Sequence, residues 1–338
     1  MKNKALKPSY VALDLTYRCG LDCSFCFVKR NGLRCGRELG LAGWLKLIRG
    51  LGPERKKFYL TGGEPLLRPF LPALIKELKN GGHSVLVTTG ACAGEKAALE
   101  LARSGPDEIV ISAHGWPELH DATAGRGSWR KTLRNFELLK EHRQPGTRLT
   151  LWCTVNSANH ARLHKVYLAL AALGADAVAF NHLEFISPGD AAATRALLAG
   201  SGYSTPVKSS ADLAKGIDPA KIAAEIAKIR RAAGSAVKFY PPLSGPEMRA
   251  WYRPEAGFRK AGLCLGQFNA AWFSPGGRMI TCQPLAVNMG SCARGAAAAY
   301  NGRTYSAFRK LLIKSGGFFP ACRRCGRAPY TAIRGRNA

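Results

Sequence analysis

Apolar runs that look like β-strands alternate with helical patterns through the first two-thirds of this 338-residue chain. Gly-rich breaks such as Gly81-Gly82 end several of the helical patterns, as helix C-caps do. This alternation predicts parallel βα units joined by right-handed crossovers. The expected strands cover residues 10–15, 57–61, 84–89, 108–112, 148–156 and 177–186, and the expected helices cover 39–50, 69–80, 94–104, 128–142, 162–173 and 219–233.

The composition changes after Gly234, which suggests a second, smaller domain. Residues 237–242 predict a strand that leads out of the barrel, and residues 305–314 predict a helix. The segment Ser-Pro-Gly-Gly lies between two apolar runs, 268–274 and 278–282, and predicts a hairpin. The stretch 187–218 has little periodicity, and we interpret it either as an insertion over the barrel mouth or as a mobile surface loop.

Three cysteines follow the first predicted strand with the spacing C-x3-C-x2-C. A tight loop of three thiolates, Cys19, Cys23 and Cys26, can ligate three irons of a [4Fe–4S] cluster and leave the fourth iron open. The alternative is a zinc site, which needs four ligands and would use Cys35 as the fourth.

A second set of cysteines lies near the end of the chain. Cys264 and Cys282 belong to the pattern C-x12-G-x4-C, and Cys322 and Cys325 form C-x2-C. Four thiolates can close every iron position of a cluster, which suits electron transfer or structure. A terminal zinc ribbon is the alternative, and Cys292 is a spare cysteine nearby.

The segment Thr61-Gly62-Gly63-Glu64-Pro65 follows the second predicted strand. Glycines allow a backbone to approach a ligand closely. Together with the cysteine loop, this segment resembles the motifs of the radical S-adenosylmethionine (SAM) superfamily. The resemblance implies an α/β fold, a partial (β/α)6 barrel in residues 1–235, followed by a small α+β iron–sulfur domain in residues 236–338.

In that family the open iron of the cluster binds SAM, and an electron from the cluster yields a 5′-deoxyadenosyl radical that takes hydrogen from substrate. The resemblance implies that Cys19, Cys23 and Cys26 hold this [4Fe–4S] cluster. It also implies SAM contacts from Phe25, Gly62, Gly63, Glu64, Thr89, Ser112 and Asn156. For Ser112 and Asn156, ordinary capping of a strand end is the alternative. The second cysteine set resembles a shortened SPASM or twitch domain, in which Cys264, Cys282, Cys322 and Cys325 hold one auxiliary [4Fe–4S] cluster.

Three titratable residues are candidates for contact with substrate. His114 follows the fourth predicted strand, and His182 and Glu184 lie two residues apart on the sixth, so that they share a face. If that face lines the barrel, the two side chains can handle a proton. A satisfied core histidine and a surface glutamate are the alternative. Cys35, Cys92 and Cys153 are expected to be buried, inert thiols.

The net charge of the chain and the motifs that it lacks indicate which partners and which compartment to expect. The net charge is +28, which favours an acidic substrate such as a peptide, a phosphorylated sugar or a polycarboxylate, although a solvated basic surface explains it equally. No nucleic-acid motif, secretory signal or run of 18 apolar residues is present, so we expect a cytoplasmic protein without a membrane span. The first predicted strand begins about ten residues into the chain, so we expect no peptide-recognition domain ahead of it.

The sequence therefore predicts a radical SAM oxidoreductase or modifying enzyme, served by a reductant protein of the flavodoxin or ferredoxin kind. The alternatives are a non-catalytic metal-binding module that binds nucleic acid through its basic surface, and an electron carrier with two clusters. Substrate identity, the outcome of the reaction and the oligomeric state are left open by the sequence.

Overall fold

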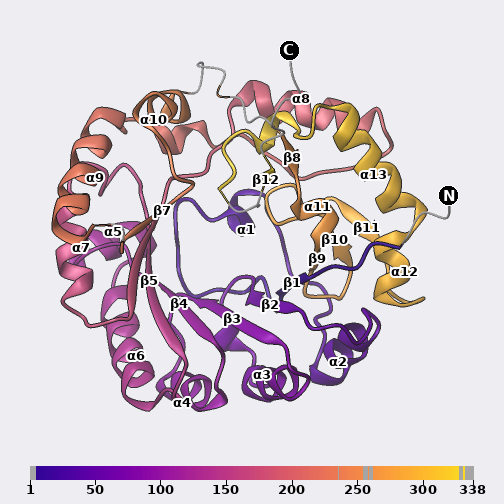
Figure 1. Ribbon diagram of the computed structural model, residues 1–338, viewed down its shortest axis with the longest axis horizontal. Helices are drawn as coiled ribbons and strands as arrows, with labels where there is room; N and C mark the ends of the chain where they lie inside the picture. The colour runs from indigo at the N-terminus through magenta and orange to yellow at the C-terminus, as the bar shows by residue number, and fades with distance from the viewer. Residues whose placement is uncertain (1–4, 235, 254–257, 259–261, 327–329, 332–338) are drawn as a thin grey trace.

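The computed structural model describes residues 5–234, 236–253, 258, 262–326 and 330–331. Its main element is a ten-stranded sheet with the strand order β11-β10-β9-β1-β2-β3-β4-β5-β6-β7. The sheet curves into an open barrel with helices around its outside (Figure 1). Neighbouring strands from β1 to β7 are parallel and follow chain order, which confirms the predicted α/β partial barrel.

The strands alternate between an outer face of apolar residues, packed under the helices, and an inner face that lines the barrel. In β3, for example, Val85 and Val87 are fully buried, whereas Leu86 and Thr88 on the opposite face are half-buried. The strands of the main sheet are β1 (Tyr10–Asp14), β2 (Lys57–Thr61), β3 (Ser84–Thr89), β4 (Glu108–Ser112), β5 (Arg148–Thr154), β6 (Ala177–Asn181), β7 (Lys238–Tyr240), β9 (Ala270–Phe273), β10 (Met279–Ile280) and β11 (Asn288–Gly290), and β8 (Leu263–Cys264) pairs separately with β12 (Tyr330–Thr331).

The helices that connect the strands turn an apolar face to the sheet. In α3, the buried residues Leu71, Leu74, Ile75 and Leu78 recur at the spacing of one helix face. The helices are α1 (Phe27–Arg30), α2 (Leu41–Arg49), α3 (Leu71–Asn80), α4 (Glu95–Ser104), α5 (Pro117–Ala124), α6 (Ser128–His142), α7 (Leu163–Ala171), α8 (Pro188–Ala199), α9 (Pro219–Ala233), α10 (Gly245–Tyr252), α11 (Gly266–Asn269), α12 (Ala296–Asn301) and α13 (Arg303–Lys314), with short 3₁₀ turns η1 (Pro65–Leu67), η2 (Ala211–Ala214) and η3 (Pro320–Cys322).

Two expectations about the elements were wrong. The strand predicted to lead out of the barrel is β7, which instead continues the sheet parallel to β6. Strand β6 ends at Asn181 and not at residue 186, because its neighbour β7 ends before Pro241, which has no N–H with which to extend the pairing. The stretch 187–218, interpreted as an insertion or a surface loop, contains a helix of twelve residues, α8, whose apolar pattern is weak, so it is not entirely a loop.

The C-terminal part of the chain joins the barrel sheet directly. The predicted hairpin is present as β9 and β10, and β9 pairs in parallel with β1, Tyr10 opposite Ala270. The main hydrophobic core contains residues from both ends of the chain. A small inner cluster of Ala12, Trp272 and Ile280 lies on the barrel side of this seam. The boundary at residues 235/236 stays a prediction, and the sheet crosses it.

Candidate functional site

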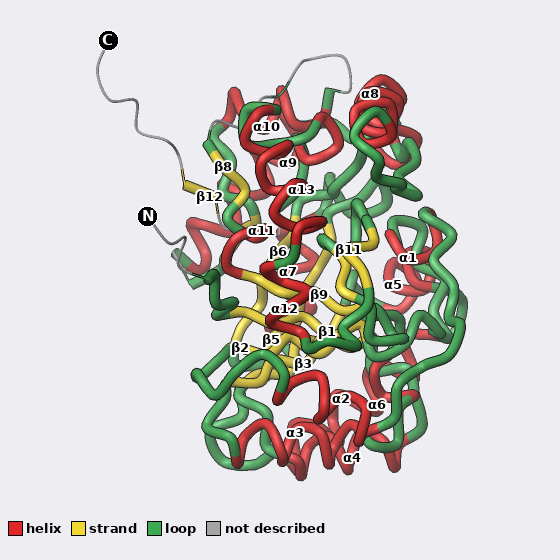
Figure 2. The backbone as a smooth tube through the Cα atoms, turned by 90° about the vertical axis from the view of Figure 1, so that its right-hand side faces the viewer, coloured by secondary structure: helices red, strands yellow, loops and turns green. Residues whose placement is uncertain are grey.

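The cysteine loop lies at the carboxyl end of β1, the edge at which parallel α/β folds place their active sites. In the side view of Figure 2, α1 and α5 lie on this side, and the N-terminus, β8 and β12 lie on the other. The thiols of Cys19, Cys23 and Cys26 are half-buried. α1 begins directly after Cys26, which is its N-cap.

Polar contacts anchor the loop at several points. The Lys29 ammonium donates to the Leu21 carbonyl and to Asp22 Oδ1, both at 2.6 Å. The Asp22 backbone N–H donates to the Ala124 carbonyl at 2.8 Å. Arg30 donates to the Ser24 carbonyl at 2.7 Å and forms a bidentate ion pair with Asp212. The loop is therefore held by α1, by α5 and by the stretch 187–218.

The three thiols fit a cluster. Burial and the nearby Cys26 and Cys19 raise the pKa of Cys23 to about 12, whereas a hydrogen bond with Cys92 lowers that of Cys19 to about 7. Within the described residues, no three His, Cys, Asp or Glu side chains meet at the distances that a single ion requires. Three half-buried thiols in one loop are ligands of the kind that an iron–sulfur cluster requires.

Gly62 and Gly63 lie against the backbone that leads into the cysteine loop. A Cβ on Gly62 would lie 2.3 Å from the Thr16 carbonyl oxygen, and one on Gly63 would lie 2.2 Å from the Arg18 carbonyl oxygen. Gly62 also has a φ of 126°, which side-chain-bearing residues rarely adopt. The backbone N–H groups of Gly63 and Glu64 donate to these same two carbonyls, at 2.6 and 2.9 Å. Both glycines are therefore required by this close backbone approach.

The Glu64 side chain is buried and organises the loop after β3. Its Oε1 accepts hydrogen bonds from Thr89 Oγ1 at 2.6 Å and from the Leu66 N–H at 3.0 Å. Its Oε2 accepts from the Gly90 N–H at 2.9 Å and from the Cys92 thiol at 3.7 Å. Burial raises the pKa of Glu64 despite these bonds. The side chains of Glu64 and Thr89 thus bond to each other in the loop after β3. The backbone of residues 62–64, and not the Glu64 side chain, therefore faces the segment that leads into the cysteine loop.

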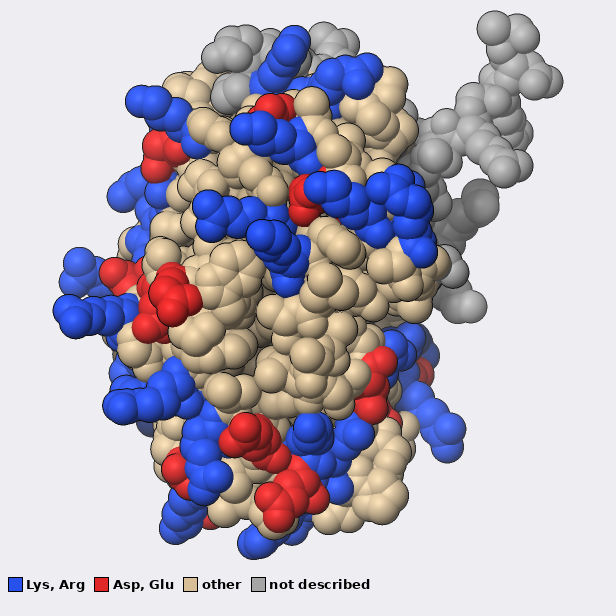
Figure 3. Space-filling model, turned by 90° about the vertical axis from the view of Figure 1, so that its left-hand side faces the viewer, with Lys and Arg blue, Asp and Glu red and all other residues tan. Residues whose placement is uncertain are grey.

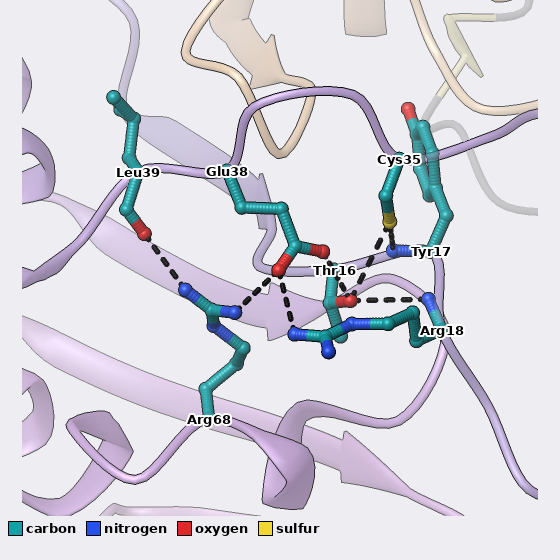
Figure 4. A network of polar contacts seen from close by, with 7 residues as sticks. All are labelled: Thr16, Tyr17, Arg18, Cys35, Glu38, Leu39 and Arg68. Carbon is teal, nitrogen blue, oxygen red and sulfur yellow. Dashed lines mark hydrogen bonds and ion pairs between the residues drawn. The ribbon is translucent and has the colours of Figure 1, made fainter.

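A network centred on Glu38 also contacts the segment 16–18 (Figure 4). Glu38 accepts from Thr16 Oγ1 at 2.5 Å and from Arg18 at 2.8 Å, and it also pairs with Arg68. Cys35 accepts a hydrogen bond from the Tyr17 N–H at 2.9 Å. The segment before Cys19 is therefore held both by residues 62–64 and by this network.

The predicted strand-end contacts lie at the same edge of the sheet. Ser112 ends β4 and is half-buried. Asn156 follows β5 and is buried; its Oδ1 accepts from the Ala158 N–H at 2.8 Å, and its Nδ2 donates to the Thr154 carbonyl at 3.2 Å. Asn156 therefore caps its own strand end.

His114 lies beside Phe25, whose ring it meets nearly edge-on with centroids 5.3 Å apart. His114 Nδ1 accepts a hydrogen bond from the Thr154 N–H at 3.3 Å, so its proton is on Nε2, which has no partner among the described residues. Burial lowers its pKa to about 3, and that of the stacked His120 to about 4. His114 is thus a neutral imidazole next to the predicted adenine contact.

His182 and Glu184 do not share a strand face, because β6 ends before them. His182 packs against Phe239 and Trp251, and its Nδ1 lies 3.0 Å from the Tyr252 hydroxyl, so it belongs to the layer under α10. Burial lowers its pKa to about 4. Glu184 Oε1 accepts from the Gly326 N–H at 2.7 Å, which connects the barrel to the second cysteine set.

The second set of cysteines does come together. Cys264, Cys282, Cys322 and Cys325 all line one cavity of about 700 Å³. Burial and the charges of Cys325 and Cys264 raise the pKa of Cys282 to about 12, and burial together with the other three thiols raises that of Cys322. Cys292 is half-buried and does not line the cavity. Four thiols around one cavity fit a closed cluster.

The loop that carries Cys322 and Cys325 is anchored to α8. Asp190, in the first turn of α8, accepts from Arg323 at 2.8 Å and from Arg324 at 3.5 Å. Arg324 is buried over the Phe185 ring and also donates to the Trp251 carbonyl at 2.6 Å. The Ala321 N–H donates to Thr194 Oγ1 at 2.9 Å. Sequence reasoning missed this role of α8, for which the carboxylate and threonine of a weakly patterned stretch gave little signal.

The remaining cysteines differ from one another. Cys153 is buried, as predicted, whereas Cys35 and Cys92 are half-buried and bond to polar groups, so for them the prediction of buried, inert thiols was wrong. Cys92 bonds to Glu64 in the loop after β3 and lowers the pKa of Cys19, contacts that its position in the sequence did not predict.

On the face over α7 and α9, Lys and Arg are interspersed with a few Asp and Glu (Figure 3). In the part of the chain that the structure describes, no helix is long and apolar enough to cross a membrane.

Comparison with known proteins agrees with this geometry. A family model for the radical SAM superfamily matches residues 13–164. Residues 13–164 form a radical SAM domain. Such domains use a [4Fe–4S] cluster and SAM, and the matched residues contain the cysteine loop, Gly62-Gly63-Glu64 and Asn156.

One relative of this radical SAM domain has a name that states a peptide substrate. A PqqA peptide cyclase of Streptomyces rochei is 29% identical over 183 residues, which cover 53% of this chain and 49% of that protein. The chain therefore spans about half the length of the curated relative it matches.

Solved structures share the fold over nearly the whole chain. Native anSMEcpe with bound AdoMet and Kp18Cys peptide has a TM-score of 0.64 at 15% identity, with coverage of 95% of this chain and 89% of that one. Streptococcus suis SuiB bound to precursor peptide SuiA has a TM-score of 0.62 at 13% identity, with coverage of 95% and 72%. The fold of these enzymes therefore extends beyond the radical SAM domain into the C-terminal part of this chain.

Proposed function

We propose that this protein is a radical SAM enzyme that cleaves SAM reductively and abstracts hydrogen from a peptide substrate. The observation that carries the proposal is the radical SAM domain, in which Gly62 and Gly63 pack against the backbone that leads into the three-cysteine loop at the carboxyl edge of the barrel. When bound, the cluster and SAM supply a 5′-deoxyadenosyl radical, and the protein supplies position and electrostatics.

The residues have distinct roles in this proposal. Cys19, Cys23 and Cys26 hold the cluster, and the backbone of Gly62, Gly63 and Glu64 receives SAM. Phe25 and His114 lie together at the adenine end, where the buried His114 Nε2–H is a donor without a partner among the described residues. Thr89 supports Glu64. Ser112, at its strand end, would contact the carboxylate or the ribose of SAM, and Asn156 would contact the ribose. Glu184 and His182 stabilise the fold through their hydrogen bonds and do not contact substrate.

The auxiliary [4Fe–4S] cluster belongs, in this proposal, to Cys264, Cys282, Cys322 and Cys325. Its support is that four thiols from distant parts of the chain line one cavity. Four protein ligands leave no open iron, so the cluster serves electron transfer and not the binding of SAM.

A peptide is favoured as substrate because relatives are named for peptide substrates, and the net charge of +28 suits an acidic one. A protein of the flavodoxin or ferredoxin kind supplies the electron. Eleven free cysteines suit a reducing compartment, and we propose the cytoplasm.

Anaerobic reconstitution tests the proposal. Two [4Fe–4S] clusters predict about eight irons per chain and dithionite-driven formation of 5′-deoxyadenosine from SAM. Cys26→Ala should abolish this cleavage and leave about four irons, because only the auxiliary cluster remains. Iron, sulfide and 5′-deoxyadenosine are measured on the same samples.

Cys292→Ala is the matched control, because Cys292 lies outside both sets of ligands. It should retain about eight irons and full cleavage. Loss of about four irons in Cys292→Ala would contradict the assignment of the auxiliary ligands. Bound zinc without SAM cleavage in the unmodified chain would contradict the proposed function itself.

A further inference from the structure

The cavity lined by the second cysteine set has an open end. Its inner end contains the cysteines with the fully buried Phe308 and Phe319. All of its exposed lining residues lie at the other end, near the amino ends of β1, β2 and β3. They are Ser9, Arg55, Lys57, Gly82 and Ser84. The cavity therefore opens at the amino end of the barrel, opposite the Cys19–Cys26 loop.

The rim of this opening is positively charged. Arg55 and Lys57 are exposed, and neither has a carboxylate at ion-pair distance among the described residues. The adjacent Lys7 and Lys56 both pair with one carboxylate, Glu54. We define Arg55 and Lys57 as the basic rim. A rim with uncompensated positive charge favours a partner with a negative surface.

Packed aromatic side chains connect the cysteine set with this rim. Cys282 packs against the inner cluster that contains Trp272. The ring centroids of Trp272 and Tyr59 are 6.1 Å apart, and those of Tyr59 and Tyr10 are 6.2 Å apart. Tyr10 lines the cavity beside the rim. An electron tunnels more readily through packed atoms than through empty space, so this row is a short route from the cluster to the surface.

We propose that an acidic one-electron carrier protein docks on the basic rim and exchanges electrons with the auxiliary cluster. The inference rests on the proposed function. One electron passes between the carrier and the cluster, so that one is oxidised and the other reduced, and no covalent bond forms or breaks. Because the rim is opposite the cysteine loop, the carrier and a peptide substrate can bind at the same time.

The test uses the full-length chain with Cys26→Ala, in which the auxiliary cluster alone remains. The cluster is reduced with dithionite, freed of excess reductant and mixed anaerobically with oxidised flavodoxin, an acidic carrier. Formation of the flavodoxin semiquinone gives the second-order rate constant. Adding Arg55→Glu with Lys57→Glu should lower this constant by about tenfold at low salt, and the difference should disappear at high salt.

The control is Lys221→Glu with Arg231→Glu, which makes the same charge change on α9, on the far side of the barrel in Figure 1. It should change the rate constant by less than about twofold. An equal loss in this control, or no loss in the rim variant, would overturn the proposal. If the rim variant binds less iron, Arg55→Gln with Lys57→Gln provides the same comparison with an expected loss of about threefold.

Failure of docking at the basic rim can be distinguished from failure of the proposed radical SAM function. Dithionite-driven SAM cleavage is measured in chains that retain Cys26, with and without the rim substitutions. Unchanged cleavage with slower transfer to flavodoxin supports docking at the rim. Absence of cleavage in every chain contradicts the proposed function, whatever the transfer rate.

Discussion

Glu38 shows how a single residue positions the cysteine loop without touching it. Its carboxylate is largely buried and joins Thr16 and Arg18, which precede the cysteine loop, to Arg68, which follows η1. Burial alone would raise its pKa, but hydrogen bonds from Cys35 and Thr16 and the two arginines lower it. The carboxylate is therefore favoured in the folded chain, and it fixes the backbone immediately before Cys19.

Glu38→Gln should lower the free energy of unfolding of the metal-free chain by about 2 kcal/mol at neutral pH, because two arginines lose their shared carboxylate. The folded-state pKa lies below the unfolded value of 4.5. The stabilisation by Glu38 is therefore complete above that value and is lost as the pH falls through the folded-state pKa. Urea unfolding at several pH values measures both effects.

The exposed Glu77→Gln on α3 is the control and should change stability by no more than about 0.5 kcal/mol. If the difference between Glu38→Gln and the unmodified chain stayed constant as the pH fell below 4.5, the carboxylate would not be the stabilising group.

At the scale of elements, α8 anchors the loop that carries Cys322 and Cys325, a role that the sequence did not predict. It comes from the aperiodic stretch after β6, and it packs against η3, which contains Cys322. Asp190 is 6% exposed, and its neighbour in the ion pair, Arg324, is 2% exposed. Leaving a buried charge without its partner costs free energy of folding, so this ion pair fixes the position of the loop that carries Cys322 and Cys325.

Asp190→Asn should weaken the auxiliary cluster and spare the other one. The asparagine keeps the size of the side chain but leaves Arg324 without its carboxylate. We expect iron to fall from about eight towards four per chain, with a changed EPR signal of the auxiliary cluster and unaltered dithionite-driven SAM cleavage.

Asp218→Asn at the N-cap of α9 is the matched control, because asparagine caps a helix as well as aspartate does. It should retain both clusters. Full iron content and an unchanged auxiliary signal in Asp190→Asn would show that the α8 anchor does not position the cysteines.

At the scale of the molecule, the two predicted domains share one sheet and one core. β9, from the C-terminal part, covers the free edge of β1, and β7 completes the other end of the sheet. An exposed edge strand invites association with other chains. The arrangement therefore makes the barrel dependent on the residues after 235.

The isolated segment 1–235 should aggregate or unfold without a cooperative transition, whereas the full chain should unfold in a single transition. Size-exclusion chromatography and urea unfolding of the two proteins test this. A monomeric 1–235 segment with a sharp transition would instead establish the predicted boundary as the limit of an independent folding unit.

The sequence by itself determined the features that depend on short stretches of chain. Strand and helix periods follow from local backbone geometry, so strands β1 to β5 and helices α3, α4, α6, α7 and α9 were predicted with nearly their observed bounds. The spacing of Cys19, Cys23 and Cys26 and the Gly62-Gly63-Glu64 segment are local in the same sense, and they pointed to the radical SAM domain.

Tertiary structure alone decided which distant residues meet. That β9 joins β1, that Glu64 faces Cys92, and that His182 lies under α10 all depend on strand order and helix packing, which no local period encodes. The same holds for the cavity between the second cysteine set and the basic rim. Its lining comes from both ends of the chain, so it exists only once the sheet has closed over β1.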